Sequence, residues 1–286
     1  MLPLVHGNAA HSMSGLGHSS VVVLAAGLGT RFGGLKQLAA VGADGAAIMD
    51  VLVARAATTG FDRAVIVVSP GTEAQVRGHL AARGRAPIPV DVAVQGLMPG
   101  RSRPLGTADA VLAARDAVDG SFVVVNGDDL YPTEGFALLA DHLGRAAAAE
   151  HAMVAFRVGR TLTGTRPVSR ALVEVDARSA LVRIREGTVV PGADGLQFEV
   201  GSSCWPLRDD ACVSMNMWGF RPVMLEALAE AVAKFVSERR PGEAFLPDVV
   251  AAQVAAGATV RVRVSEERCI GVTHDEDLAE VRNALT

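Results

Sequence analysis

The chain has 286 residues, half of them hydrophobic and a fifth charged, and its formal net charge is −4. This length suits one large α/β domain with a sizeable core. A mildly acidic chain with scattered arginines does not have the pattern of a nucleic-acid-binding protein. No run approaches the roughly 18 apolar residues that a membrane helix needs. Three cysteines predict a reduced, cytoplasmic protein.

The first 19 residues differ in composition from the rest of the chain. They contain no lysine, arginine, aspartate or glutamate and are rich in glycine, serine, histidine and alanine. Such a segment has little to anchor it, so we predict a flexible leader over 1–19. It lacks the basic start and the long apolar core of a secretory signal. We expect residues 20–286 to form a single domain with halves at 20–160 and 161–286.

In the first half, apolar runs alternate with alanine-rich helical segments. Strands are predicted over 21–25, 64–68, 90–95, 122–125 and 152–158, and helices over 48–59, 72–83, 107–117 and 136–149. This alternation predicts an α/β fold with a Rossmann-like, mixed and mostly parallel sheet that has helices on both faces.

The alternation changes in the second half. The sequence predicts a hairpin over 169–186, loops and short strands over 187–211, strands over 213–220 and 259–264, and helices over 224–237, 246–256 and 276–284. We expect this half to add a small, β-rich appendage that covers the carboxyl edge of the sheet.

The most informative segment is the loop after the first predicted strand. In VVVLAAGLGTRFGGLKQL, residues 21–38, four glycines surround Thr30, Arg31 and Lys36. Glycines let the backbone approach a phosphate and direct its N–H groups toward it. Arg31 and Lys36 add the positive charge that a triphosphate needs. Lys36 is one of only two lysines in the chain.

The spacing of this loop excludes two common phosphate-binding motifs. A Walker loop requires Gly-Lys-Ser/Thr, but Lys36 lacks a preceding glycine and is followed by Gln37. The dinucleotide fingerprint G-x-G-x-x-G is missed by one residue. The remaining alternative is an ordinary strand–loop–helix turn without a ligand.

Further candidates lie at the ends of predicted strands, where open α/β sheets bind their ligands. The amide of Gln95 can pair with a pyrimidine edge or make a structural hydrogen bond. Gly106 and Thr107 open a helix whose backbone N–H groups can bind a base or a phosphate. Asp128, in VNGDDLYP, can hold Mg²⁺ against phosphate oxygens. Asp129 could do the same, or both carboxylates could cap the turn.

In this order the motifs resemble those of the sugar-1-phosphate nucleotidylyltransferases, which have the nucleotide-diphospho-sugar transferase fold. The matching segments, within residues 21–278, are LAAGLGTRFGGLKQL, VAVQ, PLGTADAV, VNGDDLYP, ALVEVD, VSMNMWGF, EAFLPDVV and GVTHDEDL. The resemblance implies a Mg²⁺-dependent cytoplasmic enzyme that transfers NMP from an NTP, UTP or dTTP by preference, to a sugar 1-phosphate. Pyrophosphate is released, and a homo-oligomer is an open possibility.

The resemblance also assigns roles in the nucleotide-binding half, residues 20–160. The implied nucleotide-binding residues are Ala26, Gly27, Gly29, Thr30, Gln95, Gly106 and Thr107. Arg31 and Lys36 would neutralise phosphate charge, and Asp128 would hold Mg²⁺. These three are the implied catalytic residues.

In the acceptor-binding half, residues 161–286, Glu174 and Asn216 match residues that bind sugar hydroxyls in such enzymes. Glu174 could instead pair with Arg183 or Arg185 across its hairpin. A buried amide such as that of Asn216 needs partners, which a ligand or the backbone could supply.

The end of the chain departs from the family pattern. Residues 269–274 lack the second metal-binding aspartate of many members, and GVTHDEDL is closer to the cytidylyltransferases. The acceptor half also lacks the family's second catalytic lysine, for which Arg183 or Arg185 could substitute.

Three alternative functions remain open from the sequence. The first is a cytidylyl- or guanylyltransferase for a non-sugar phosphate, such as that of a polyol, choline, a phosphonate or a cofactor precursor. The second is a glycosyltransferase, against which the chain has Asp128-Asp129 in place of a D-x-D motif. The third is an inactive regulatory binder, which the retained Arg31, Lys36 and Asp128 disfavour.

Overall fold

The structure is a computed structural model that describes residues 16–27, 36–98, 100–101, 103–145, 149–192, 195–272 and 276–285, without the side chain of Lys36. The strands are β1 (Ser19–Leu24), β2 (Arg63–Val68), β3 (Val90–Val94), β4 (Ser121–Asn126), β5 (Asp129–Leu130), β6 (His151–Arg157), β7 (Val168–Val175), β8 (Leu181–Gly192), β9 (Gly195–Val200), β10 (Ser203–Leu207), β11 (Cys212–Phe220), β12 (Val260–Ser265) and β13 (Ile270–Gly271).

The helices are α1 (Ile48–Thr58), α2 (Glu73–Arg83), α3 (Thr107–Ala113), α4 (Thr133–Arg145), α5 (Val223–Ser237), α6 (Leu246–Ala255) and α7 (Asp277–Leu285). Short 3₁₀ turns cover Lys36–Leu38, Arg115–Ala117 and Val158–Thr161. Among the described residues, no helix is long and apolar enough to cross a membrane.

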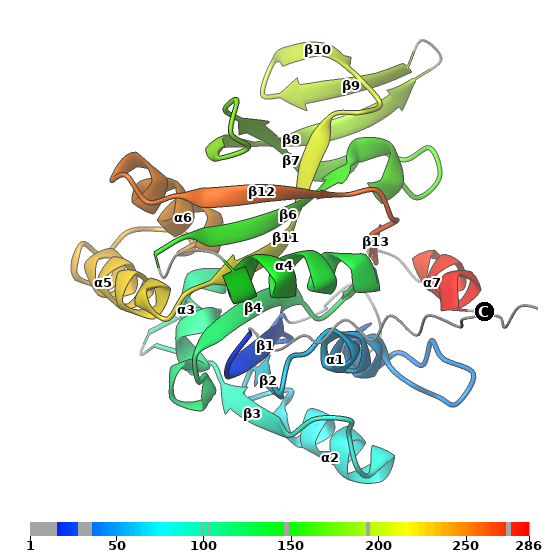
Figure 1. The fold of residues 1–286 in the computed structure, drawn as a ribbon, viewed down its shortest axis with the longest axis vertical. Coiled ribbons are helices and arrows are strands. Elements are labelled where there is room, and N and C mark those ends of the chain that lie inside the picture. Colours follow the sequence, from blue (N-terminus) through cyan, green and yellow to red (C-terminus); the bar gives the residue numbers. More distant parts are fainter. Residues whose placement is uncertain are drawn as a thin grey trace, which may run out of the picture.

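One large sheet organises the molecule (Figure 1). Its order is β10-β9-β8-β7-β11-β4-β1-β2-β3, and β6 pairs with both β11 and β12. The strands β1 to β4 pair in parallel, whereas β11 is antiparallel to β4, β6 and β7. A separate two-stranded ladder joins β13 to β5, so that Gly271 lies opposite Asp129.

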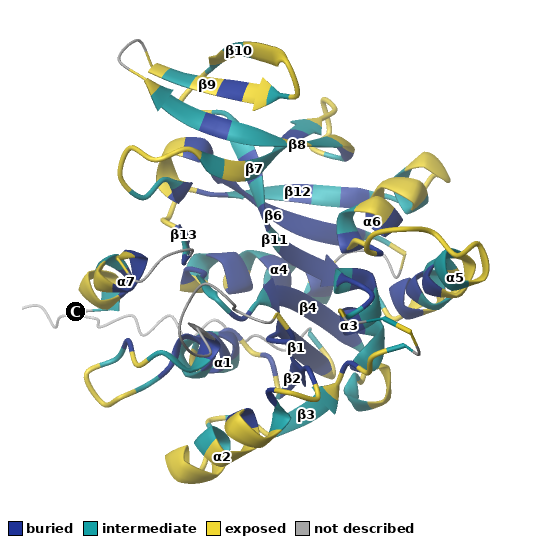
Figure 2. Ribbon diagram, turned by 180° about the vertical axis from the view of Figure 1, so that it is seen from behind, coloured by how far each residue is buried: buried dark blue, intermediate teal, exposed yellow. Residues whose placement is uncertain are grey.

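The side chains of β1 point alternately to the two faces of the sheet and so belong to two hydrophobic layers. Val21 and Val23 join the core beneath α1, α4 and α7, while Val22 and Leu24 join the core beneath α3, α5 and α6. Because both faces are covered, the strand is apolar along its whole length, as is typical of a buried parallel strand. Figure 2 shows the buried central strands and the more exposed hairpins at β8, β9 and β10.

The fold class predicted from the sequence is confirmed, with helices on both faces of a mixed sheet. The second half differs from the expected appendage in one respect. Its strand β11 lies between β4 and β7 and so continues the main sheet, because its apolar residues pack on both layers. Only β7 to β10 project as an antiparallel extension with a small core of its own around Val189, Phe198 and Val213.

Residues 16–19 of the predicted leader belong to the folded domain. Residues 1–15 lie outside the described part of the chain. Leu16 packs against the core, His18 contacts the Asp62 carboxylate at 3.1 Å, and Ser19 already belongs to β1.

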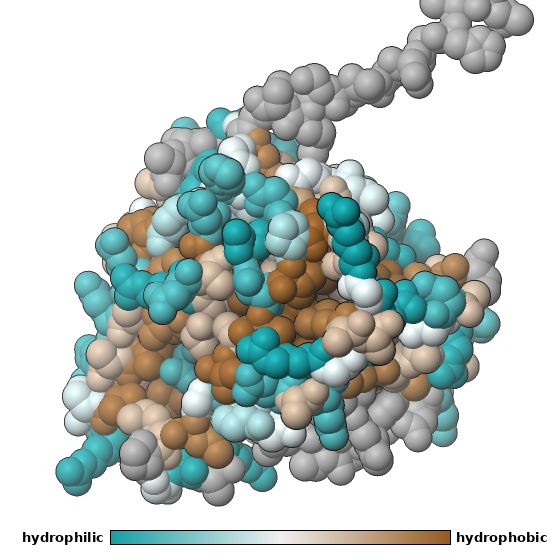
Figure 3. Space-filling model, turned by 90° about the horizontal axis from the view of Figure 1, so that it is seen from below, coloured by the Kyte–Doolittle hydropathy of each residue, from teal (hydrophilic) through white to brown (hydrophobic). Residues whose placement is uncertain are grey.

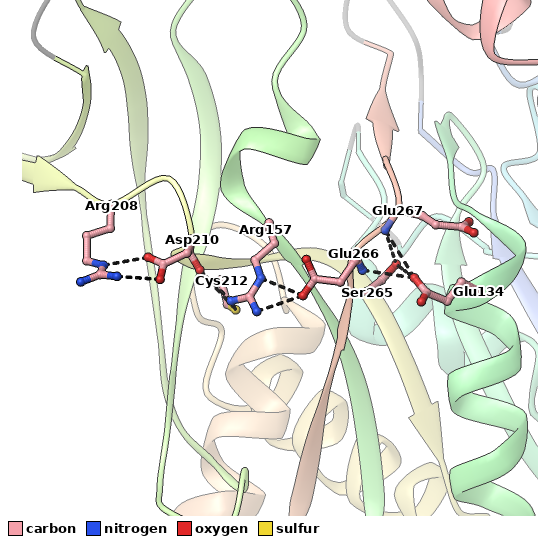
Figure 4. Close-up of polar contacts among 8 residues, drawn as sticks. All are labelled: Glu134, Arg157, Arg208, Asp210, Cys212, Ser265, Glu266 and Glu267. Atoms are coloured by element: carbon pink, nitrogen blue, oxygen red, sulfur yellow. Dashed lines mark hydrogen bonds and ion pairs between the residues drawn. The ribbon is translucent and has the colours of Figure 1, made fainter.

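Polar contacts fix the far end of β12 (Figure 4). The Glu134 carboxylate, in the first turn of α4, accepts hydrogen bonds from the Ser265 hydroxyl and from the backbone N–H of Glu266 at 3.2 Å. Arg157, at the end of β6, donates to the Glu266 carboxylate at 3.0 Å and to the carbonyl of Asp210 at 2.9 Å. These contacts hold β12 and β6 against α4 just before the chain enters β13.

The buried histidine at the start of β6 predicts a loss of stability in acid. His151 accepts a hydrogen bond from the Arg221 backbone N–H at 3.2 Å, and its pKa is lowered to about 4 by burial and then by the Arg221 charge. Between this value and roughly 6.5 the unfolded chain binds more protons, so stability is complete above pH 6.5 and falls as the pH falls.

We expect the free energy of unfolding, measured with urea, to be lower at pH 5 than at pH 7.5 by roughly 2 kcal/mol from this residue. The variant His151→Asn should lose most of that difference, and His18→Asn, at an exposed histidine, should keep it. An unchanged pH dependence in His151→Asn would contradict this assignment.

Candidate active site

The carboxyl ends of the parallel strands are joined by backbone hydrogen bonds that continue beyond the strands themselves. The backbone N–H of Ala25 donates to the carbonyl of Val67 at 2.7 Å, and the backbone N–H of Gln95 donates to the carbonyl of Val68 at 2.8 Å. Gly127 donates to the carbonyl of Leu24 at 2.9 Å. These bonds bring the segments after β1, β3 and β4 to one edge of the sheet, where ligands bind in open α/β folds.

A cavity of about 550 Å³ opens at this edge, and we call it the nucleotide pocket after the predicted nucleotide-binding residues that line it. It is lined by Leu24, Ala26, Gly27, Gln37, Gln95, Arg103, Pro104, Gly106, Thr107, Ala110, Asn126, Asp128 and Glu243. The structure thus brings together Ala26, Gly27, Gln95, Gly106, Thr107 and Asp128 from the predicted set. Gly29, Thr30, Arg31 and the side chain of Lys36 lie outside the described part of the chain, and their roles stay predictions.

Gln95 is buried and engaged with the start of α3. Its amide nitrogen donates to the Gly106 carbonyl at 2.9 Å and to the Asp109 carboxylate at 2.7 Å. Both amide hydrogens therefore have protein acceptors, which is the structural role left open by the sequence. The amide oxygen is the group that Gln95 can offer to a ligand in the pocket.

Gly106 is required by a close approach of two backbone segments. It has φ +120°, and a Cβ atom there would lie 2.6 Å from the carbonyl oxygen of Ala244. Ala244 accepts a hydrogen bond from Ala108 N–H at 2.9 Å. The Thr107 hydroxyl accepts one from Leu246 N–H, also at 2.9 Å. The segment before α6 is thereby clamped onto the beginning of α3.

A second cavity of about 310 Å³ adjoins the first, and we call it the acceptor pocket because Asn216, a predicted acceptor-binding residue, lines it. It is lined by Thr107, Asn126, Asp129, Ser169, Arg170, Ala171, Glu186, Ser214, Met215, Asn216, Phe245, Pro247 and Gly271. Thr107 and Asn126 line both cavities. The two pockets therefore meet at the ends of α3 and β4.

A chain of side-chain hydrogen bonds lies between the pockets. The Asn126 amide donates to Asp129 at 2.8 Å and accepts from the Asn216 amide at 2.7 Å. The Asn216 oxygen in turn accepts from the Trp218 indole N–H at 2.7 Å. The sequence left a ligand or the backbone as the partner of Asn216, whereas the structure gives it two side chains.

Asn216 reaches this position through an irregularity in β11. The pairing of β11 with β6 shifts between Ser214 and Met217, and Asn216 has φ +60°. Asparagine tolerates this left-handed conformation better than most residues, and such bulges redirect side chains near functional sites.

The two consecutive aspartates serve different cavities. Asp128 lines the nucleotide pocket and Asp129 lines the acceptor pocket. Burial and then the Asp128 charge raise the pKa of Asp129 to about 7, although its hydrogen bond from Asn126 acts in the opposite direction. The role of Asp128 as a metal ligand stays a prediction.

Arg170 is the one cationic side chain among the described residues that line the acceptor pocket. Its guanidinium donates to the Thr161 hydroxyl at 3.1 Å, to the Thr161 carbonyl at 2.6 Å and to the Ser169 carbonyl at 2.8 Å. These three bonds fix the plane of a charge that lies beside Asp129. Burial lowers the pKa of Arg170, and Asp129 opposes this effect.

Glu174, to which the family resemblance gives an acceptor-binding role, lines neither pocket. Arg185 contacts its carboxylate at 3.4 Å across the β7–β8 hairpin, the arrangement that the sequence left as an alternative. The acceptor pocket instead contains Glu186, because Glu186 pairs with Ala171, which also pairs with Ser214 of β11. Glu174 lies three residues after Ala171 on β7, about 10 Å further along the strand.

Gln37 is a pocket residue that the sequence analysis did not single out. It is buried, and its side-chain oxygen has no hydrogen-bond partner among the described residues. A buried polar atom normally has a partner, and none of the described residues supplies one here. Its place beside Lys36 in the glycine-rich motif was the signal that could have identified it.

A cavity of about 700 Å³, larger than these two, lies elsewhere, between α1, α2 and the beginning of β3. Figure 3 looks onto this side of the molecule and shows hydrophobic side chains gathered in a hollow that hydrophilic ones surround. None of the residues that line this cavity belongs to the predicted site.

The constraint at Gly106 yields a stability prediction. Gly106→Ala should destabilise the protein by roughly 3 kcal/mol in urea unfolding, because it adds a clash with Ala244 to the strain of a positive φ. Gly257→Ala is the matched control, since Gly257 has φ +98° but open space around it, and should cost roughly 1 kcal/mol. Equal losses in the two variants would show that the Ala244 contact is not the constraint.

The comparison with known proteins agrees with this geometry. The profile of the family described as "Nucleotidyl transferase" matches residues 20–261. The bifunctional protein GlmU of Hyphomonas neptunium is 31% identical over 272 residues, which cover 91% of this chain and 50% of that protein. The GlmU of Anaeromyxobacter sp. strain Fw109-5 is 30% identical, with 93% and 49% covered. The chain thus spans about half the length of these curated relatives.

Two solved structures share the fold. The inositol-1-phosphate CTP transferase from T. maritima aligns with a TM-score of 0.64 at 15% identity and covers 94% of this chain and 96% of that one. HddC from Yersinia pseudotuberculosis aligns with a TM-score of 0.62 at 14% identity and covers 93% and 99%. With its profile match, its relatives and this fold, the chain belongs to the nucleotidyl transferase family of enzymes, as its motifs predict.

Proposed function

We propose that the protein transfers a nucleoside monophosphate from an NTP to a sugar 1-phosphate, with release of pyrophosphate. The observation that carries this proposal is the pair of adjoining pockets that share Thr107 and Asn126. An enzyme that joins two phosphorylated substrates needs two such sites that meet at the reacting phosphorus. The three cysteines have no disulfide partners among the described residues, which fits a reaction in the cytoplasm.

The proposed reaction is an in-line displacement. A phosphate oxygen of the acceptor attacks the α-phosphorus of the NTP, the bond from that phosphorus to the β-phosphate oxygen breaks, and pyrophosphate leaves with the bonding pair. No covalent intermediate on the protein is needed. The protein then contributes by holding both substrates in line and by neutralising their charge.

Asp128 fits a divalent cation because Mg²⁺ binds to proteins through one or two carboxylates together with substrate phosphates. No group of three histidine, cysteine, aspartate or glutamate side chains forms a complete metal cage in the described part of the chain. A site made of Asp128 and the triphosphate is consistent with both facts. Mg²⁺ would supply charge neutralisation at the phosphates.

The acceptor pocket contains the groups that a sugar phosphate needs. We assign the acceptor phosphate to Arg170, whose guanidinium is fixed and can bind a phosphate through two donors. Neither Arg183 nor Arg185 lines the pocket. We assign the hydroxyl groups of the acceptor to Glu186, together with Asn216, in place of Glu174.

Which NTP the enzyme uses depends on the base that Gln95 can bind. The free group of Gln95 is its amide oxygen, which can accept from N3–H of uracil or thymine. This supports UTP or dTTP. The same oxygen can accept from the amino group of cytosine, and one similar solved structure is named an inositol-1-phosphate CTP transferase. A cytidylyltransferase for a non-sugar phosphate is therefore the second candidate.

A panel of four NTPs against sugar 1-phosphates, polyol phosphates and phosphocholine, with pyrophosphate release as the readout, tests the proposal. We expect the highest turnover with UTP or dTTP and a sugar 1-phosphate, and loss of turnover in EDTA. Highest turnover with CTP and a polyol phosphate would establish the second candidate, and no release with any pair would refute both.

The two lysines allow a matched test of the glycine-rich loop. Lys36→Ala should lower kcat by at least roughly 100-fold, because an aligned charge at the reacting phosphates is a large part of the catalysis. Lys234→Ala removes the other lysine, which is exposed on α5 near Glu238, and should leave kcat unchanged. Equal kcat values for folded Lys36→Ala and the wild type would refute the role of Lys36.

The two carboxylates of the β7–β8 hairpin allow a second matched test. Glu186→Gln should raise the KM of the acceptor by at least roughly tenfold and leave the KM of the NTP unchanged, because a hydrogen bond to a charged group is lost. Glu174→Gln should change neither value. The reverse result would place Glu174 at the acceptor and Glu186 outside it.

Arginine variants test the acceptor phosphate. Arg170→Lys keeps the charge but loses the planar fork, so the acceptor KM should rise moderately, and Arg170→Gln should raise it by at least roughly 100-fold. Arg185→Gln is the control, because Arg185 pairs with Glu174 and lies over the Trp205 ring. A similar acceptor KM in Arg170→Gln and wild type would exclude Arg170 from phosphate binding.

A further inference from the structure

A groove rich in arginine lies apart from both pockets of the active site. Its volume is about 660 Å³, and we call it the basic groove. It is lined by Asp141, His142, Arg145, Glu150, Arg178, Ser179, Arg261, Val262, Arg263 and Val264. None of these residues lines the nucleotide or acceptor pocket. Four arginines face two acidic residues here, in a chain whose formal net charge is −4.

Three segments form the walls of the basic groove and are tied to one another. Arg261 of β12 donates to the Arg178 carbonyl at 2.9 Å and to the Glu150 carboxylate at 3.0 Å. The backbone N–H of Val262 donates to the carbonyl of Ser179 at 2.8 Å. The turn of the β7–β8 hairpin is thus held against β12, and the Glu134 contacts hold the other end of β12 (Figure 4).

Two of the arginines have no hydrogen-bonded partner within the described part of the chain. Arg263 lies two residues after Arg261 on β12, so both side chains leave the same face of the strand. Its guanidinium approaches only the Asp141 carboxylate, at 3.9 Å. Asp141 is already paired with Arg145 at 2.7 Å. The guanidinium of Arg178, on the exposed hairpin turn, has neither a hydrogen bond nor an ion pair among the described residues, although its charge lies near the Asp176 carboxylate.

A buried polar atom gives a second, independent sign of a ligand. His142, on α4, lines the groove and is only 7% exposed. Its Nε2 atom is buried and has no hydrogen-bond partner among the described residues. A buried ring nitrogen normally has one. A rotation of the ring toward the groove would bring this nitrogen within reach of a phosphate oxygen or hydroxyl.

We propose that the basic groove binds a small molecule that carries two or more phosphate groups. Guanidinium groups match phosphate oxygens through paired donors, and Arg178 and Arg263 offer two such groups, one for each of two phosphates. The volume is in the range of small-molecule sites. The bound anion would neutralise the like charges of Arg178 and Arg263 and would bond to His142. This site is separate from the proposed reaction and does not depend on it.

Calorimetric titration with tripolyphosphate, in EDTA and at constant ionic strength, tests the proposal. EDTA removes divalent cations and so weakens phosphate binding at Asp128. We expect the wild type to bind one tripolyphosphate. The variant Arg178→Gln/Arg263→Gln should bind at least roughly tenfold more weakly. The control Arg208→Gln/Arg240→Gln, which removes two exposed arginines paired with Asp210 and Glu238, should bind as the wild type does.

Two further variants separate the basic groove from the active site and from misfolding. The variant Lys36→Ala/Asp128→Asn should bind tripolyphosphate as the wild type does. Loss of binding in this variant would place the anion in the nucleotide pocket and overturn the proposal. Because Arg178 lies on an exposed turn, the single variant Arg178→Gln can replace the double variant in the titration if the double variant is unfolded. Without the anion, the groove variants should be at least as heat-stable as the wild type, because like charges are removed. An unchanged Kd in them would refute the site.

Discussion

The side chain of Asn126 joins the two halves of the molecule at the end of β4. It donates to Asp129 and accepts from Asn216, which comes from a strand 90 residues later in the sequence. The hydroxyl of Tyr131 completes the junction, since it donates to the Met215 carbonyl at 2.5 Å and accepts from Asn126 N–H at 3.2 Å. Both pockets depend on this junction, because Asn126 lines each of them.

The junction also explains two unfavourable features nearby. A positive φ at Asn216 is strained for a non-glycine residue, and the raised pKa of Asp129 reflects a carboxylate that burial disfavours in its charged form. Each is held by hydrogen bonds to Asn126. Such local strain persists only where the surrounding structure determines the conformation, and it occurs here between the two proposed substrates.

Much of the first half could be predicted because its uninterrupted apolar runs indicate strands that are buried on both faces. A run such as VVVL must lie between two apolar layers, and the ends of parallel strands must share one edge. That reasoning placed Gln95, Gly106 and Asp128 at one cavity. The choice between Glu174 and Glu186 could not be made this way. Both lie in alternating hairpin strands, and only the register between β7, β8 and β11 decides which carboxylate meets the pocket.

The two pockets differ in how firmly the fold supports them, and this has a consequence for specificity. The nucleotide pocket rests on parallel strands covered on both faces, so a change in its walls disturbs the central core. The acceptor pocket draws Arg170 and Glu186 from a hairpin with a small separate core. Substitutions in that hairpin can alter the acceptor groups while β1 to β4 stay intact.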